Sequence, residues 1–162
     1  MRIRKASVDD VSLLIAIGRH SSSAHWSERQ YRELLAGSPG MLVLVAEEER
    51  EDAPADDPSC RSIERHALVG FLVARHIAID WELENVVVAP SRRRTGLGVG
   101  LLKALLNAAR DTNSEAVFLE VRESNSAARK LYEKLTFRET GRRKSYYTNP
   151  LEDAILYRLD LS

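Results

Sequence analysis

The residues of this sequence that are best suited to bind a ligand lie in a glycine-rich segment between a predicted strand and a predicted helix. The segment Arg92–Gly100 follows an apolar, strand-like run and precedes a helical pattern, so several of its main-chain N–H groups lack a helical partner. Glycine permits positive φ and the close approach of a ligand, and the start of a helix carries partial positive charge. These features predict an anion site suited to a pyrophosphate.

Two other kinds of phosphate loop are excluded by residue type. A dinucleotide fingerprint built on Gly96 and Gly98 requires glycine at position 101, which is Leu101. A P-loop requires Gly-Lys followed by Ser or Thr, and this segment lacks that motif. The remaining alternative is a tight turn whose glycines only permit the bend.

One acidic side chain is placed for proton transfer. Along the predicted strand 116–121, Val117, Leu119 and Val121 share one face. Glu120 falls on the other face, with Phe118 and Arg122. Partly apolar surroundings raise the pKa of a carboxylate and make it a better proton acceptor near neutral pH. A simple ion pair with Arg122 or another cation is the alternative. Glu82 and Glu84 are rival bases or substrate contacts, and spacing does not rank them.

Apolar periodicity and turn residues predict the elements that must position these groups. Helices are expected near 8–19, between Ser27 and Gly37, from Gly98 to Ala109, and from Asn125 to Leu135. Strands are expected at 41–46, 68–79, 84–88 and 116–121, and near 137–147 and 153–160. The connection 48–66 is predicted to be long and mobile, and the acidic run 47–57 to be a solvated loop. The fold class is therefore mixed α/β (α+β).

Length and composition indicate one domain spanning 1–162. The chain has 162 residues, of which 44% are hydrophobic, enough for a core of its own. Its net charge is zero, which argues against nucleic-acid binding despite the basic triplets Arg92–Arg94 and Arg142–Lys144. It has no apolar signal core or spanning run, so we expect a cytoplasmic protein. Cys60 is the only cysteine and the histidines lack metal-ligand spacing, so no metal site is expected.

Three motifs in order resemble those of the GNAT N-acetyltransferase superfamily. Arg93-x-x-Gly96-x-Gly98 after a strand resembles its coenzyme A pyrophosphate loop, and the later stretches resemble its last conserved region. Within the superfamily, nearly the whole chain resembles the RimI-type ribosomal-protein-alanine N-acetyltransferases. The stretches that carry these resemblances are Trp26-Ser27, Asn85–Val88, Leu119–Arg122, Ser124-Asn125, Leu131–Phe137, Arg142-Arg143, Tyr146-Tyr147 and Glu152–Ala154.

This resemblance implies a fold and a co-substrate. The fold would be a mixed, mostly antiparallel sheet of about six to seven strands flanked by about four helices. Acetyl-coenzyme A would be the co-substrate, with no metal. The cofactor-binding residues that the resemblance implies are Val86, Val87, Val88, Arg93, Arg94, Thr95, Gly96, Leu97, Gly98, Val99 and Asn125.

The resemblance also implies a reaction. Glu120 would be the general base, directly or through water, and Tyr132 the general acid, while Glu84, Tyr146 and Tyr147 would contact the acceptor. The implied activity is acetyl transfer to a protein N-terminal α-amino group, of the ribosomal-protein-alanine type, by direct attack in a ternary complex. An α-amino group has a pKa of about 8, against about 10.4 for lysine. It is therefore already partly neutral near pH 7, and a weaker base suffices to deprotonate it.

Departures from the family pattern bear on the acceptor. Thr136 stands where the family has glycine, His25 stands where it has proline, and the 48–66 connection is long. A lysine side chain or a small-molecule amine is therefore the alternative acceptor, and a catalytically silent coenzyme A-binding module is a further alternative. The expected partner is a protein or peptide N-terminus rather than nucleic acid or a membrane, and the expected state is a monomer or weak homodimer.

Overall fold

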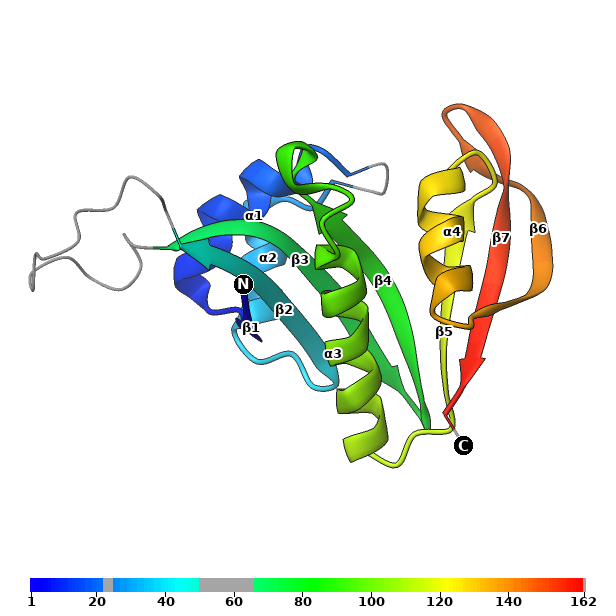
Figure 1. Cartoon of the computed structure of the whole chain (residues 1–162), viewed down its shortest axis with the longest axis horizontal. Coiled ribbons are helices and arrows are strands. Elements are labelled where there is room, and N and C mark those ends of the chain that lie inside the picture. Colours follow the sequence, from blue (N-terminus) through cyan, green and yellow to red (C-terminus); the bar gives the residue numbers. More distant parts are fainter. Residues whose placement is uncertain (22–24, 50–65, 162) are drawn as a thin grey trace, which may run out of the picture. The chain divides into compact units, whose positions relative to one another are not determined.

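The structure, a computed structural model, describes residues 1–21, 25–49 and 66–161 (Figure 1). Its helices are η1 (Val8–Asp10), α1 (Val11–Gly18), α2 (Glu28–Leu35), η2 (Pro90–Arg92), α3 (Leu97–Asp111) and α4 (Ser126–Lys134). Its strands are β1 (Arg2–Lys5), β2 (Met41–Glu49), β3 (His66–Ile77), β4 (Asp80–Val88), β5 (Ala116–Arg122), β6 (Arg138–Thr148) and β7 (Leu151–Asp160). The expected mixed α/β fold class is confirmed.

The strands are ordered β1-β2-β3-β4-β5-β7-β6 in a seven-stranded sheet. Adjacent strands β1 and β2, β5 and β7, and β6 and β7 pair antiparallel, whereas β4 and β5 pair parallel over Trp81–Leu83 and Val117–Leu119. A parallel pair needs a crossover connection, which α3 supplies. The sheet is thus mostly antiparallel, as expected.

Internal contacts divide the chain into two compact units that interleave in sequence. The first unit comprises 1–73 and 85–101, and the second comprises 74–84 and 102–162. Strands β3 and β4 and helix α3 therefore contribute residues to both units.

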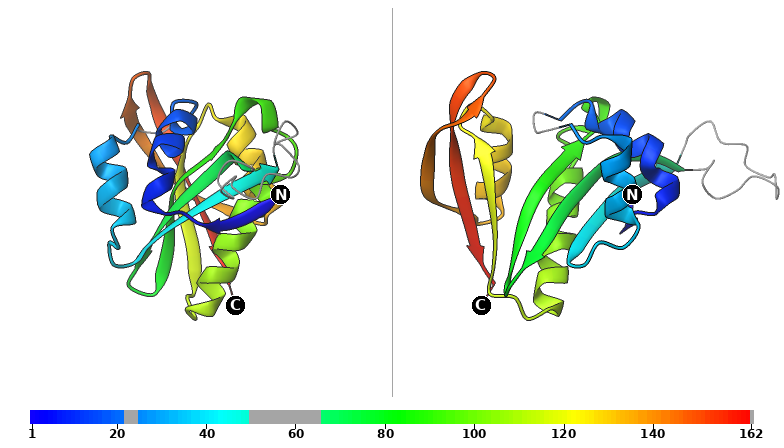
Figure 2. Two further views of the ribbon diagram at one scale, coloured as in Figure 1. Left: turned by 90° about the vertical axis from the view of Figure 1, so that its left-hand side faces the viewer. Right: turned by 180° about the vertical axis from the view of Figure 1, so that it is seen from behind.

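An apolar core holds the first unit together. Helices α1 and α2 cover the same face of β2 and β3 (Figures 1 and 2). Tyr31 packs edge-on against Phe71, with ring centroids 6.1 Å apart, which joins α2 to β3. The buried residues of this core are Val11, Leu14, Ile17, Tyr31, Val43, Val45, Phe71, Val73 and Val87.

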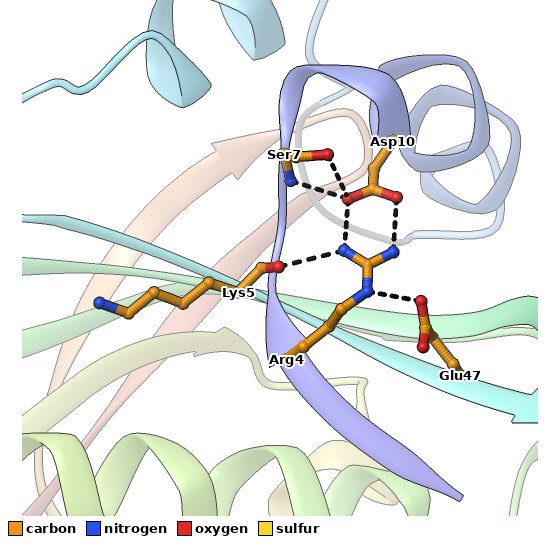
Figure 3. A network of polar contacts seen from close by, with 5 residues as sticks. All are labelled: Arg4, Lys5, Ser7, Asp10 and Glu47. Atoms are coloured by element: carbon orange, nitrogen blue, oxygen red, sulfur yellow. Dashed lines mark hydrogen bonds and ion pairs between the residues drawn. The ribbon is translucent and has the colours of Figure 1, made fainter. Parts of the chain in front are cut away.

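A polar network fixes β1 onto η1 and β2 (Figure 3). Arg4 donates two hydrogen bonds to the Asp10 carboxylate, at 2.8 and 2.9 Å, and its Nε donates to Glu47 Oε1 at 2.5 Å. Asp10 also accepts the Ser7 N–H at 2.8 Å, as part of a capping box at the start of η1. The Asp10 and Glu47 side chains are only 7% and 8% exposed, so this network is buried.

The network corrects one expectation and adds one element. Glu47 is buried on β2, so the prediction that the acidic run 47–57 is a solvated loop is wrong for this residue. The part of that run beyond Glu49 lies outside the described residues. Strand β1 was not predicted, because Arg2–Lys5 has one apolar residue, Ile3, and becomes a strand by pairing with β2. The connection expected at 48–66 also falls mostly outside the described residues.

In the second unit, β5 presents an apolar face and a polar face. Val117, Leu119 and Val121 are buried, whereas Phe118, Glu120 and Arg122 are half-buried, so the predicted alternation is confirmed. Helix α3 buries Leu102, Leu105, Leu106 and Ala109, at the predicted helical spacing. None of the helices in the described ranges is long and apolar enough to cross a membrane.

Candidate active site

The glycine-rich segment joins β4 to α3, as the sequence predicted. Arg94 and Gly96 have φ of 64° and 92°, so the chain bends sharply before the helix, and the space where a Gly96 Cβ would point is open. The first helical hydrogen bond runs from the Gly100 N–H to the Gly96 carbonyl at 2.9 Å. Among the described residues, no acceptor lies within reach of the main-chain N–H groups of 94–99. Such an array at the start of a long helix suits a polyanion.

The arginine triplet before this turn is only partly available to a ligand. Arg92 forms an ion pair with Glu48 at 2.7 Å, and Arg93 donates to the carbonyls of Val88 and His20, each at 3.3 Å. The Arg94 side chain contacts no polar partner within the described ranges. Arg94 is therefore the cation of the triplet that an anion could recruit.

The end of β4 lies in the same unit as this turn. Val87 is buried, and Val86 and Val88 are half-buried. The Val88 carbonyl accepts the Arg93 hydrogen bond, so the end of the strand and the turn are tied together. Asn125, the other predicted cofactor residue, lies in the second unit, where its Oδ1 caps α4 by accepting the Ala128 N–H at 3.2 Å.

In the second unit, Glu120 lies among polar side chains rather than apolar ones. Its carboxylate forms an ion pair with Arg143 Nε at 2.8 Å and accepts a hydrogen bond from the Tyr146 hydroxyl. That hydrogen bond, together with the carboxylate charge, raises the pKa of Tyr146, which stays protonated near neutral pH. The Glu120 side chain is 18% exposed, which leaves it accessible. Glu120 is therefore ion-paired, as the alternative expected, but its partner is Arg143 rather than Arg122, which pairs with Glu152 at 2.8 Å.

Tyr132 is a buried aromatic residue, and no described residue bonds to its hydroxyl. Its ring packs against Phe137 and Tyr157, with centroid distances of 5.8 and 6.0 Å, and only 5% of the residue is exposed. Burial, reinforced by nearby Tyr147, raises the pKa of the Tyr132 phenol well above its ordinary value. Within the described ranges the hydroxyl has no hydrogen-bond partner, and such a buried group costs about 1–3 kcal/mol. It is a protonated donor that lacks an acceptor.

Tyr147 connects these groups. It is half-buried, its ring contacts the Arg122 guanidinium at 4.2 Å, and its centroid lies 5.1 Å from that of Tyr146. Burial raises the pKa of Tyr147, and the charge of Glu120 adds to the rise. The structure therefore brings together Glu120, Tyr132, Tyr146 and Tyr147, which the sequence places on three elements.

The rival carboxylates on β4 share one cation. Arg75 pairs with Glu82 at 2.8 Å and with Glu84 at 3.2 Å. Burial raises the pKa of Glu84, and the Glu82 charge adds to this, whereas Arg75 opposes it. Of the two rivals, Glu84 therefore has the environment of a proton acceptor.

Arg75 and Arg143 are the residues that sequence reasoning missed at this site. In the sequence, Arg143 belongs to a basic triplet and to the pair Arg142-Arg143 that resembles the GNAT pattern, and nothing singles out Arg75. Neither signal indicates a carboxylate partner, because the order of the strands in the sheet brings each arginine to its carboxylate. Within the described ranges, no group of three or more His, Cys, Asp or Glu side chains forms a metal site.

Residues 19–137 match the acetyltransferase (GNAT) family. The chain belongs to this family. Over 88 residues this GNAT protein is 38% identical to the [ribosomal protein bS18]-alanine N-acetyltransferase of Haemophilus influenzae, a match that covers 54% of this chain and 60% of that protein. The chain thus spans less than two thirds of that relative.

Two further similarities cover more of the chain. It is 31% identical over 171 residues to the N-alpha-acetyltransferase of Sulfolobus acidocaldarius, covering 96% of this chain and 89% of the relative. Its fold matches the crystal structure of the ribosomal-protein-S18-alanine N-acetyltransferase of Escherichia coli with a TM-score of 0.77 and 26% identity, covering 99% and 94%. The expected resemblance to the GNAT superfamily and its RimI type is therefore confirmed.

Proposed function

We propose that this GNAT protein moves the acetyl group of acetyl-coenzyme A to the α-amino group of a protein N-terminus, by direct attack within a ternary complex. The observation that carries the proposal is the cluster in the second unit, where an accessible carboxylate lies with a buried, protonated phenol. Two relatives support the acceptor class, since one is named an N-alpha-acetyltransferase and the other a ribosomal-protein-alanine N-acetyltransferase. A ribosomal-protein alanine is accordingly the first acceptor to test.

The residues of the first unit fit coenzyme A. The unpaired N–H groups of 94–99 would hold its diphosphate, with Arg94 as the added cation. The main chain of Val86–Val88 would bind the pantetheine arm. When bound, acetyl-coenzyme A supplies an activated acyl thioester.

Glu120 and Tyr132 would move the protons. Glu120 accepts a proton from the acceptor amine, and its ion pair with Arg143 and hydrogen bond from Tyr146 fix the direction of the carboxylate. Tyr132 holds a proton on Oη for the departing sulfur, and burial keeps that phenol protonated at working pH. Unlike the Tyr146 hydroxyl, the Tyr132 hydroxyl has no hydrogen-bond partner in the described part of the chain, and it is available as a donor.

The acceptor would lie against the polar face of this unit. Tyr146 is 49% exposed and Tyr147 is half-buried, so both can contact a peptide, and Glu84 offers a carboxylate for the incoming ammonium. An α-amino group loses its proton about two pH units below lysine, which suits a carboxylate base.

A panel of peptides tests the proposal. The protein is incubated with acetyl-coenzyme A and one of three acceptors: a peptide with a free N-terminal alanine, the same peptide blocked at its N-terminus and carrying a lysine, or spermidine. Intact mass and fragmentation should locate one acetyl group on the α-amine of the first peptide. Glu120→Gln and Tyr132→Phe should each reduce that transfer. Acetylation of the blocked peptide or spermidine, with none on the free N-terminus, would refute it.

A further inference from the structure

Strand β6 departs from regular pairing beside Glu120. Its register with β7 runs through Arg143 opposite Ala154 and resumes at Tyr147 opposite Glu152. The residues 144–146 of β6 therefore lie opposite Asp153 alone, which is a β-bulge. Ser145, at the centre of the bulge, has φ of 51°, a left-handed conformation that is unfavourable for a residue with a Cβ.

Asp153 holds this bulge with both of its carboxylate oxygens. Oδ1 accepts the Ser145 N–H at 2.8 Å, and Oδ2 accepts from Arg142 Nη1 at 3.1 Å. Arg142 is held in turn by Glu123, at 2.7 Å. Since Ser145 cannot make a regular ladder bond in this conformation, Asp153 replaces that bond and stabilises the bulge.

The bulge lets two side chains of β6 reach one carboxylate. Arg143 contacts Glu120 at 2.8 Å, and the Tyr146 hydroxyl donates to the same group. The Arg143 guanidinium also lies 5.5 Å from the Tyr146 ring centroid. Residues three apart in a regular strand point to opposite faces of the sheet. Arg143 and Tyr146 converge on Glu120 only because the strand is irregular between them.

We propose that Asp153 is a positioning residue for the reaction, acting through the bulge to hold Arg143 and Tyr146 against Glu120. This inference rests on the proposed function, in which Glu120 is the base. The two contacts restrict the carboxylate to one orientation, and misplacing a reacting group by about 1 Å can cost on the order of a hundredfold in rate. Asp153 acts through Ser145 and Arg142, to which its carboxylate is hydrogen-bonded.

Substitutions at Asp153 test this role. Asp153→Ala removes the acceptor of the Ser145 N–H and should lower kcat for the peptide by about tenfold to a hundredfold, with KM for acetyl-coenzyme A within about twofold. Asp153→Asn keeps an oxygen for that N–H and should recover most of the loss. Asp160→Ala is the matched control, because Asp160 is an exposed partner of Arg158 on the same strand and should leave kcat unchanged. A wild-type kcat in Asp153→Ala would overturn the inference.

Coupling to Glu120 separates positioning from general destabilisation. In a Glu120→Gln background, Asp153→Ala should have little further effect on kcat, because it acts through the missing carboxylate. Effects of the two substitutions that multiply independently would overturn the inference. Should Asp153→Ala fold poorly, Ser145→Val should lose about tenfold relative to Ser145→Gly, since valine resists positive φ and glycine accepts it. Equal activity of these two variants would also overturn it.

An NMR titration of Tyr146 tests the positioning role of Asp153 without depending on which amine accepts the acetyl group. The hydrogen bond to Glu120 raises the pKa of Tyr146 in the folded chain. Breaking the bulge with Asp153→Ala should therefore lower the pKa of Tyr146 toward its ordinary value, measured by NMR titration of ring-labelled tyrosine. An unchanged Tyr146 titration refutes the positioning role, whereas failure of the wild-type protein to acetylate any N-terminus refutes the proposed function alone.

Discussion

Removing the guanidinium of Arg4 is expected to destabilise the fold by about 3 kcal/mol near neutral pH. Arg4→Met keeps much of the apolar stem but leaves the Asp10 and Glu47 carboxylates, 7% and 8% exposed, without a cation. Breaking a buried ion pair on one side costs about 3–5 kcal/mol. The Arg4 side chain is 27% exposed, so water already screens the network in part, and we expect the lower end of that range.

The cost should shrink as the pH falls. Burial alone would raise the pKa of Asp10, but the hydrogen bonds from Arg4 and Ser7 hold it below its ordinary value of 3.8. In the wild-type protein this stabilisation is present above that ordinary value and is lost as pH falls through the lower folded pKa. In Arg4→Met, burial dominates, so Asp10 takes up its proton at higher pH and the unpaired charge disappears.

Urea unfolding followed by circular dichroism at about pH 7 and about pH 4 measures both effects. The matched control is Arg29→Met, because Arg29 is 87% exposed and pairs with Glu33 on α2. That exposed pair is worth about 0.3–0.5 kcal/mol. The reasoning fails if Arg4→Met costs no more than Arg29→Met, or if its cost is the same at both pH values.

Three further substitutions probe the proposed site and the fold. Tyr132→Phe should lower kcat by about tenfold to a hundredfold, while calorimetry should find the affinity for acetyl-coenzyme A unchanged. An unaltered kcat would show that Tyr132 is not the general acid. Gly96→Ala should weaken acetyl-coenzyme A binding by about tenfold, because φ of 92° disfavours alanine and the turn must shift; equal heats of titration would contradict this. Gly70→Ala should lower the free energy of unfolding by about 1–3 kcal/mol, since its Cβ would lie 2.8 Å from the Val87 carbonyl oxygen. In the control Gly141→Ala the nearest atom would lie at 3.5 Å, so the free energy of unfolding should fall clearly less.

Short-range patterns in the sequence were sufficient to predict the glycine-rich turn before α3 and most helices and strands. The main-chain N–H groups of 94–99 have no acceptor among the described residues, because they stand at the start of a helix. This follows from the order of a strand, glycines and an amphipathic run. The alternation that places Glu120 opposite the apolar face of β5 is likewise a property of neighbouring residues. The capping by Ser27 and Asn125 depends on residues only three positions away. Each of these features involves a few consecutive residues, so the sequence determines it directly.

Tertiary structure decided which residues surround the candidate base and which strands exist at all. Arg4 and Glu47 are separated by 43 positions, and β1 forms only because β2 offers it a partner. Arg143 and Tyr146 contact Glu120 because of the order of the strands and the register of β6 on β7. The bulge in β6 turns one of these two side chains to the face on which Glu120 lies. Periodicity and propensity carry no information about register between distant strands, because register depends on the packing of the whole sheet. The sequence therefore determined the identity of the candidate base, and the fold determined its charged environment.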